Sequence, residues 1–170
     1  MRIAFTGPES SGKTTLSKWL STELSNSVYI AEFAREYLEE EKIVRAREND
    51  FIQIVKNQCA LFNQMTSKAH QIFDTDIFVL RIWNEEIFKL NLPELKILPS
   101  YVMDIHFLCA PDVEWEEDPL RSVPAQSERE RLFEKYKIEL RNSLVKFIVL
   151  SGSIDEKKFL ILSSIRNSSF

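Results

Sequence analysis

The chain has 170 residues, of which 44% are hydrophobic and 28% charged, and its formal net charge is -4. These values predict one soluble globular domain over residues 1–170, and the negative charge argues against a nucleic-acid partner. We expect no membrane partner either, since no stretch approaches the roughly 18 apolar residues of a membrane span and no signal peptide is visible. Cys59 and Cys109 are too far apart for a metal-binding cluster, so we expect two buried free thiols in the cytoplasm.

The first motif lies between a predicted buried strand at residues 3–5 and a predicted helix at residues 14–24. Its spacing, Gly7-x-x-x-x-Gly12-Lys13-Thr14, is that of the phosphate-binding P-loop. The glycines let successive backbone N–H groups turn inward at the positive end of the helix that follows. Lys13 is predicted to reach the β- and γ-phosphates, and the Thr14 hydroxyl to bind Mg²⁺. The predicted ATP-binding residues are Gly7, Pro8, Glu9, Ser10, Ser11, Gly12, Lys13, Thr14 and Thr15.

A second strand is predicted at residues 28–30, and a charged helical segment follows at residues 31–38. In open α/β sheets, ligands bind beyond the carboxyl ends of the strands. Glu32 and Arg35 therefore stand where a substrate could bind. The alternative is an ordinary solvated first turn of a helix.

A third strand is predicted in residues 71–76, and it ends in two acids, Asp74 and Asp76. In a P-loop protein, an aspartate that closes an apolar strand typically holds a water of the Mg²⁺ shell or orients the attacking group. Asp74 fits this position. Asp76 is either a helix cap or a substrate-binding residue.

Hydrophobic periodicity predicts the remaining elements. We expect helices over residues 51–65 (capped by Asn49 or Asp50), 77–90, 128–140 and 154–165, and strands over residues 101–109 and 146–150. Strands that alternate with helices predict an α/β sandwich with a mainly parallel sheet and helices on both faces. Trp83 belongs either to the core or to a substrate cleft, and His106, inside a strand, is predicted to be structural.

The segment after the fourth predicted strand is acidic and contains three prolines, Pro111, Pro119 and Pro124. Phosphoryl transfer needs cations near the transferred group and a cover that excludes water. We therefore predict a lid at about residues 111–130 that supplies Arg121, Arg129 and Arg131. The alternative is a solvated loop followed by a salt-bridged helix.

The chain resembles the ribosylnicotinamide kinase domain of the bifunctional NAD-biosynthesis regulator family and its stand-alone AAA-type ATPase relatives. The resemblance lies in the P-loop at residues 7–16, in Ala31-Glu32-Phe33-Ala34-Arg35-Glu36-Tyr37, in Asp74-Thr75-Asp76, and in Trp115 with Asp118-Pro119-Leu120-Arg121. It implies a three-layer, nucleoside-kinase-like sandwich with a five-stranded parallel sheet of order 2-3-1-4-5 and a lid. It also implies transfer of the ATP γ-phosphate to the 5′-hydroxyl of nicotinamide riboside. The adenylyltransferase domain of the bifunctional members has no counterpart in this sequence.

We therefore predict a phosphotransferase that uses ATP and Mg²⁺ and acts on a small-molecule nucleoside. The predicted catalytic residues are Lys13, Asp74, Glu32 and Arg121, with Glu32 or Asp74 as the general base, and Thr14 and Asp74 are the predicted metal-binding residues. The predicted substrate-binding residues are Glu32, Arg35, Asp76 and Trp115, and the predicted lid residues are Asp118, Arg121 and Arg129. The alternatives are a kinase for another nucleoside and a nucleotide-dependent regulatory switch. Nothing in the sequence predicts an oligomeric state.

Overall fold

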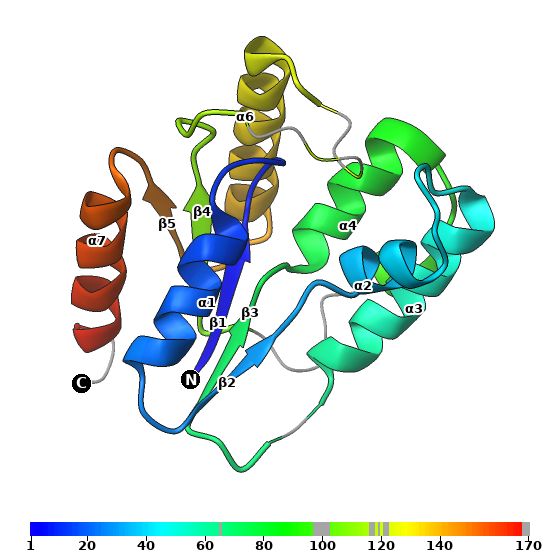
Figure 1. Ribbon diagram of the computed structural model, residues 1–170. Coiled ribbons are helices and arrows are strands. Elements are labelled where there is room, and N and C mark those ends of the chain that lie inside the picture. Colours follow the sequence, from blue (N-terminus) through cyan, green and yellow to red (C-terminus); the bar gives the residue numbers. More distant parts are fainter. Residues whose placement is uncertain (65, 97–102, 116–117, 119, 121–122, 168–170) are drawn as a thin grey trace.

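The computed structural model describes residues 1–64, 66–96, 103–115, 118, 120 and 123–167. Its centre is a five-stranded sheet of order β2-β3-β1-β4-β5 (Figure 1), and all the neighbouring strands are parallel. The strands are β1 (Arg2–Thr6), β2 (Ser27–Ile30), β3 (His70–Phe73), β4 (Ile105–Cys109) and β5 (Phe147–Leu150). The predicted fold class and strand order are confirmed.

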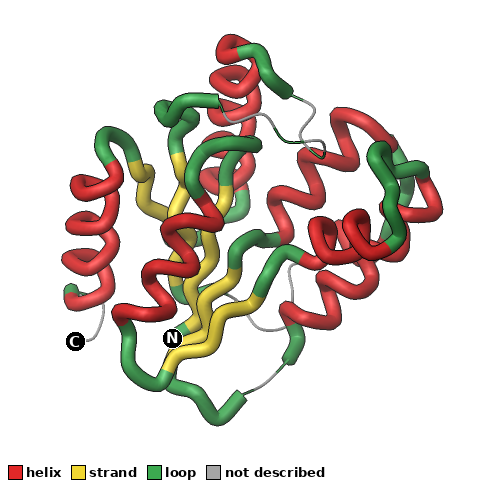
Figure 2. Tube along the Cα trace, viewed as in Figure 1, coloured by secondary structure: helices red, strands yellow, loops and turns green. Residues whose placement is uncertain are grey.

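Helices cover both faces of the sheet (Figure 2). Together with the sheet they form two separate clusters of apolar side chains. Ile3 and Phe5 of β1 belong to the cluster of α1 (Lys13–Glu23) and α7 (Ile154–Arg166), whereas Ala4 between them belongs to the opposite cluster. This alternation follows from the two-residue period of a strand. The opposite cluster contains α2 (Phe33–Glu40), α3 (Glu48–Phe62), α4 (Ile77–Trp83), α5 (Pro93–Lys96) and α6 (Gln126–Asn142). No helix in the described ranges is long and apolar enough to cross a membrane.

The helix predicted over residues 77–90 changes its geometry part-way. It is α-helical as far as Trp83 and continues as a π-helix, η1 (Asn84–Phe88). Lys89, with a left-handed φ of 56°, then ends it. The Trp83 ring lies edge-on to Phe51 at 5.1 Å, and Phe88 stacks on the same phenylalanine at 4.2 Å. Trp83 is therefore partly buried and packs against the core.

Several predicted boundaries were wrong, among them the starts of the fourth strand and of α3. The fourth strand begins at Ile105, and the Asp104 side chain just before it accepts a hydrogen bond from the backbone N–H of Arg2 (2.6 Å). Residues 101–102 of the predicted strand lie outside the described residues. Helix α3 begins at Glu48, earlier than predicted, and the residue before it is Arg47. Asp50 lies inside the first turn and accepts a hydrogen bond from the Arg47 N–H (2.8 Å).

Both cysteines are free. Cys109 is fully buried in β4, and burial raises the pKa of its thiol to about 12. Cys59 is only partly buried, and desolvation raises the pKa of its thiol to about 11. Both groups are therefore neutral thiols at ordinary pH.

The aromatic cluster around Phe51 offers a direct test of the core. Replacement of Phe51 by alanine should lower the free energy of unfolding by about 3–5 kcal/mol, because it leaves a cavity against Phe88 and Trp83. Chemical denaturation measures this loss. As a control, Phe159→Ala on α7, where the side chain is 75% exposed, should change it by no more than about 0.5 kcal/mol. Equal losses for the two variants would contradict the core assignment.

Candidate functional site

The P-loop lies directly against the end of β4. Gly7 has a φ of +131°, and a side-chain Cβ at this position would come within 2.6 Å of the Cys109 carbonyl oxygen. Gly12 has open space around it, but its φ of +85° is left-handed, and it is the residue from which α1 starts. Glycine is needed at the first position for space and at the second for backbone conformation.

Lys13 lies folded over the loop that precedes it. Its Nζ donates hydrogen bonds to the carbonyl oxygens of Gly7 (2.9 Å) and Pro8 (2.8 Å). The Ser11 hydroxyl donates to the same Pro8 oxygen at 2.8 Å. Thr14 is exposed in the first turn of α1. Lys13 therefore lies beside the backbone of the loop.

Asp74 follows β3 and is only 3% exposed. Its Oδ1 accepts a hydrogen bond from the Ser17 hydroxyl (2.9 Å), and its Oδ2 accepts one from the Tyr29 hydroxyl (2.8 Å). Burial raises the pKa of Tyr29, and the charge and hydrogen bond of Asp74 raise it further. Sequence reasoning missed both hydroxyls. Ser17 follows Thr14 by one helical turn, which was a usable signal, whereas nothing in the sequence singled out Tyr29.

Glu32 occupies the cap position of α2 and is partly exposed. Burial raises the pKa of its carboxyl group, and the charges of Asp74 and Glu9 raise it further, while Lys13 and Arg35 oppose the rise. These charges act on Glu32 from β3, the P-loop and α2, so the carboxylate lies among them. Within the described residues, no hydrogen bond holds the Glu32 side chain.

The residues predicted to bind Mg²⁺ suit an ion that arrives with the nucleotide. Magnesium keeps several waters and is usually held by one or two protein groups together with substrate phosphates. The exposed Thr14 hydroxyl is one such group. Each oxygen of Asp74 accepts one hydrogen bond and keeps a second lone pair for a metal-bound water. The described ranges contain no group of three or more His, Cys, Asp or Glu side chains that could hold a metal alone.

Arg35 connects the helix after β2 with the segment between β4 and α6. Its Nη2 pairs with Asp118 Oδ2 at 2.7 Å, and its Nη1 pairs with Glu39 Oε1 at 3.1 Å. The predicted substrate residue Arg35 and the predicted lid residue Asp118 therefore contact each other.

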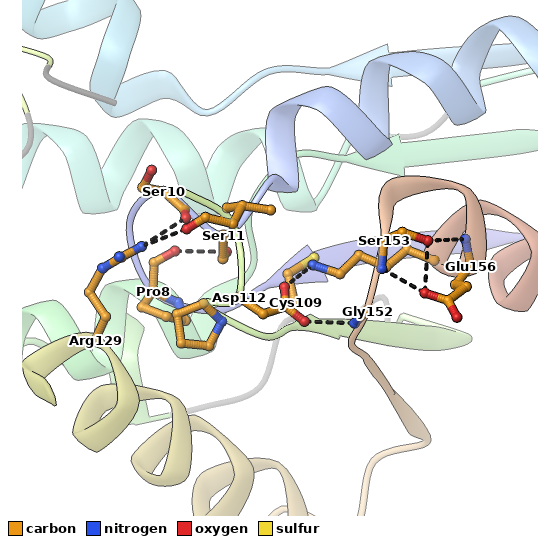
Figure 3. A network of polar contacts seen from close by, with 12 residues as sticks. Pro8, Ser10, Ser11, Cys109, Asp112, Arg129, Gly152, Ser153 and Glu156 are labelled. Carbon is orange, nitrogen blue, oxygen red and sulfur yellow. Dashed lines mark hydrogen bonds and ion pairs between the residues drawn. The ribbon is translucent and has the colours of Figure 1, made fainter. Parts of the chain in front are cut away.

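Arg129, predicted as a lid cation, is only 3% exposed and reaches back to the P-loop (Figure 3). Its Nη1 donates to the Ser10 carbonyl oxygen at 3.2 Å, and its guanidinium lies 5.4 Å from the ring centroid of Trp115. Arg131 points elsewhere and forms exposed ion pairs with Glu86 and Glu128, as the salt-bridged alternative predicted. Arg121 lies outside the described residues.

The same segment is also fixed at its start (Figure 3). Asp112 accepts a hydrogen bond from the backbone N–H of Gly152 at 2.7 Å and pairs with the buried Lys157. Sequence reasoning missed this contact, because it joins the ends of β4 and β5 from distant parts of the chain.

Asp76 lies inside the protein instead of facing the site. Its Oδ1 accepts hydrogen bonds from the Thr6 hydroxyl (3.0 Å) and from the backbone of Phe78 and Val79, and its Oδ2 contacts His106 Nδ1 at 2.8 Å. The side chain is 0% exposed. The capping alternative is confirmed, and the buried carboxylate leaves no surface for the predicted substrate contact. His106, 3% exposed, is structural as predicted.

A family model described as an AAA domain matches residues 2–157. The chain belongs to this AAA domain family. No curated protein matches it in sequence.

Several solved structures share the fold. A NadR protein in complex with NR is 19% identical, with a TM-score of 0.76, over 99% of this chain and 51% of that one. A NadR protein in complex with NAD and AMP-PNP is also 19% identical, with a TM-score of 0.70, over 99% and 50%. Deoxyadenosine kinase from M. mycoides, with dCMP and dCDP bound, is 16% identical, with a TM-score of 0.67, over 98% and 100%. The chain thus spans about half the length of the NadR proteins. The predicted resemblance is confirmed for the fold.

The buried position of Asp76 leads to a stability prediction. Asp76→Ala should lower the free energy of unfolding by about 3 kcal/mol, because it removes a cap and leaves the buried Thr6 and His106 groups without their partner. Urea denaturation measures the loss. Asp155→Ala, an exposed change in the first turn of α7, should cost less than about 1 kcal/mol. A loss below about 1 kcal/mol for Asp76→Ala would contradict this role.

Proposed function

We propose that the protein is an ATP-dependent kinase that phosphorylates the 5′-hydroxyl of nicotinamide riboside to give nicotinamide mononucleotide. The likeness in fold to a NadR protein in complex with NR supports the choice of acceptor. The fold is common to kinases with other nucleoside and nucleotide ligands, so the acceptor is the part of the proposal that most needs a test.

The observation that carries the proposal is a carboxylate at the start of α2 on which the charge of the P-loop lysine acts. Glu32 lies in the fields of Lys13 and Asp74, has a raised pKa, and is not held by a hydrogen bond within the described residues. A kinase needs a base for the acceptor hydroxyl beside the phosphate site. A nucleotide-dependent switch does not need this base.

Each group then has a role. Glu32 accepts the proton of the acceptor's 5′-hydroxyl while the hydroxyl oxygen bonds to the γ-phosphorus of ATP. The bond between this phosphorus and the β-phosphate oxygen breaks, which releases ADP. We choose Glu32 over Asp74 as the base because both Asp74 oxygens already accept hydrogen bonds from Ser17 and Tyr29. Lys13, with Arg121, stabilises the transferred phosphoryl group.

Mg²⁺ fits this arrangement as a companion of ATP. Thr14 would hold it directly and Asp74 through a water, and the ion would neutralise charge on the β- and γ-phosphates. Arg35 would bind the acceptor.

The first test is phosphate transfer from Mg·ATP to a panel of nucleosides that includes nicotinamide riboside, with the products identified by mass. Lys13→Ala should lower turnover about a hundredfold or more, because it removes the cation at the phosphates. Lys56→Ala, an exposed change on α3, should leave turnover unchanged. A product from another nucleoside alone would overturn the acceptor. ATP binding without any product would favour the switch.

Glu32→Gln tests the base. It should lower kcat about a hundredfold with little effect on the affinity for ATP, whereas the exposed Glu36→Gln on the same helix should not. The reactive form is the carboxylate, so the wild-type rate should fall as the pH drops through the raised pKa of Glu32, above the ordinary glutamate range. Glu32→Gln should no longer show this fall of the rate at low pH. If the variant still shows it, another group is the base.

A further inference from the structure

Arg129 is a buried cation whose position the proposed chemistry does not explain. It lies in the first turn of α6 and is 3% exposed. Its guanidinium donates to two backbone carbonyls, Ser10 (3.2 Å) and Val113 (3.5 Å), and to the side-chain oxygen of Gln126. All three acceptors are neutral. Burying a charge is costly unless hydrogen bonds compensate, so this geometry needs a reason.

The contact with Ser10 fixes the orientation of one peptide of the P-loop. The described chain contains no cis peptide, and in a planar trans peptide the Ser10 C=O and the Ser11 N–H point in opposite directions. Arg129 holds the carbonyl, so the Ser11 N–H points away from the guanidinium. Inward N–H groups of this kind bind phosphate oxygens in a P-loop.

The backbone at Ser10 has an uncommon conformation. Its φ of 51° lies in the left-handed region, which costs a non-glycine residue of the order of 1 kcal/mol or more. Reorientation of the Ser10–Ser11 peptide changes ψ of Ser10 and φ of Ser11. It would turn the Ser11 N–H away from the phosphate side and leave the φ of Ser10 as it is. The charge-assisted hydrogen bond from Arg129 opposes that change.

Neighbouring contacts join the same parts of the chain. The backbone N–H of Val123 donates to Glu9 Oε2 at 3.0 Å, and the Ser10 hydroxyl donates to the Glu114 carbonyl at 3.4 Å. Trp115 lies against the Arg129 guanidinium. The segment between β4 and α6 therefore contacts the P-loop from the same region as Arg129.

We propose that Arg129 is a positioning residue, which holds the Ser10–Ser11 peptide with its N–H turned toward the bound phosphates. It acts through the P-loop backbone and does not touch the transferred group. The inference rests on the proposed ATP binding and is independent of the identity of the acceptor.

Calorimetric titration of ATP and of ADP into the whole protein tests this. Arg129→Met keeps an unbranched apolar stem but removes the guanidinium and its hydrogen bonds. It should weaken the binding of both nucleotides by the same factor, about 10- to 100-fold. Arg131→Met removes the same charge two residues away, from an exposed ion pair, and should change neither affinity. In turnover assays, Arg129→Met should raise KM for ATP and leave kcat within about threefold, which a general loss of folded protein would not do.

Three results would overturn the proposal. A loss for ATP without a loss for ADP would mean that Arg129 binds the γ-phosphate directly. Equal losses of nucleotide affinity for Arg129→Met and Arg131→Met would mean that only the net charge matters. Unchanged affinities for Arg129→Met would mean that Arg129 does not position the P-loop. If Arg129→Met fails to fold, Arg129→Lys carries the test: it keeps the charge without the planar fork, so it should still weaken ATP and ADP equally. Neither titration needs an acceptor, so the two titrations test this inference even if no nucleoside is phosphorylated.

Discussion

The absence of a side chain at Gly7 is the constraint on which the rest of the site depends. It allows the P-loop to lie against the Cys109 carbonyl, where any Cβ would be 2.6 Å from the oxygen. The loop is therefore fixed over the carboxyl end of β4 and beside that of β3. Because all five strands are parallel, the residues that follow β2 and β3, Glu32 and Asp74, arrive at the same edge.

Charges of both signs lie close together at this edge. Glu9, Glu32 and Asp74 bring negative charge close together, and Lys13 and Arg35 oppose its effect on Glu32. Asp74 is further stabilised by two hydroxyl donors, whereas Glu32 is left with a raised pKa. Two carboxylates from neighbouring strands thus differ in environment, which is the condition for giving them different roles in one site.

The segment between β4 and α6 is joined to each of its neighbours by a different contact. Asp112 bonds to Gly152 after β5, Asp118 pairs with Arg35 of α2, and Val123 bonds to Glu9 of the P-loop. The P-loop and α2, which we propose as the nucleotide and acceptor sites, therefore contact one connecting segment. Any movement of that segment would change the surroundings of both elements.

The sequence by itself determined the P-loop, the alternation of strands and helices, and the acid at the end of β3, because these depend on local spacing and hydrophobic period. The strand order came only from the resemblance, since spacing along the chain does not say which strands pair. Only the tertiary structure decided which of two similar residues, close together in sequence, faces the site. Asp74 faces the site edge, whereas Asp76, two residues on, turns into the core toward His106. Arg129 and Arg131 likewise lie on different sides of α6, and only packing decides that one is buried against the P-loop and the other is exposed. Such contacts join residues that are distant in sequence, and their partners exist only once the sheet and its helices have assembled.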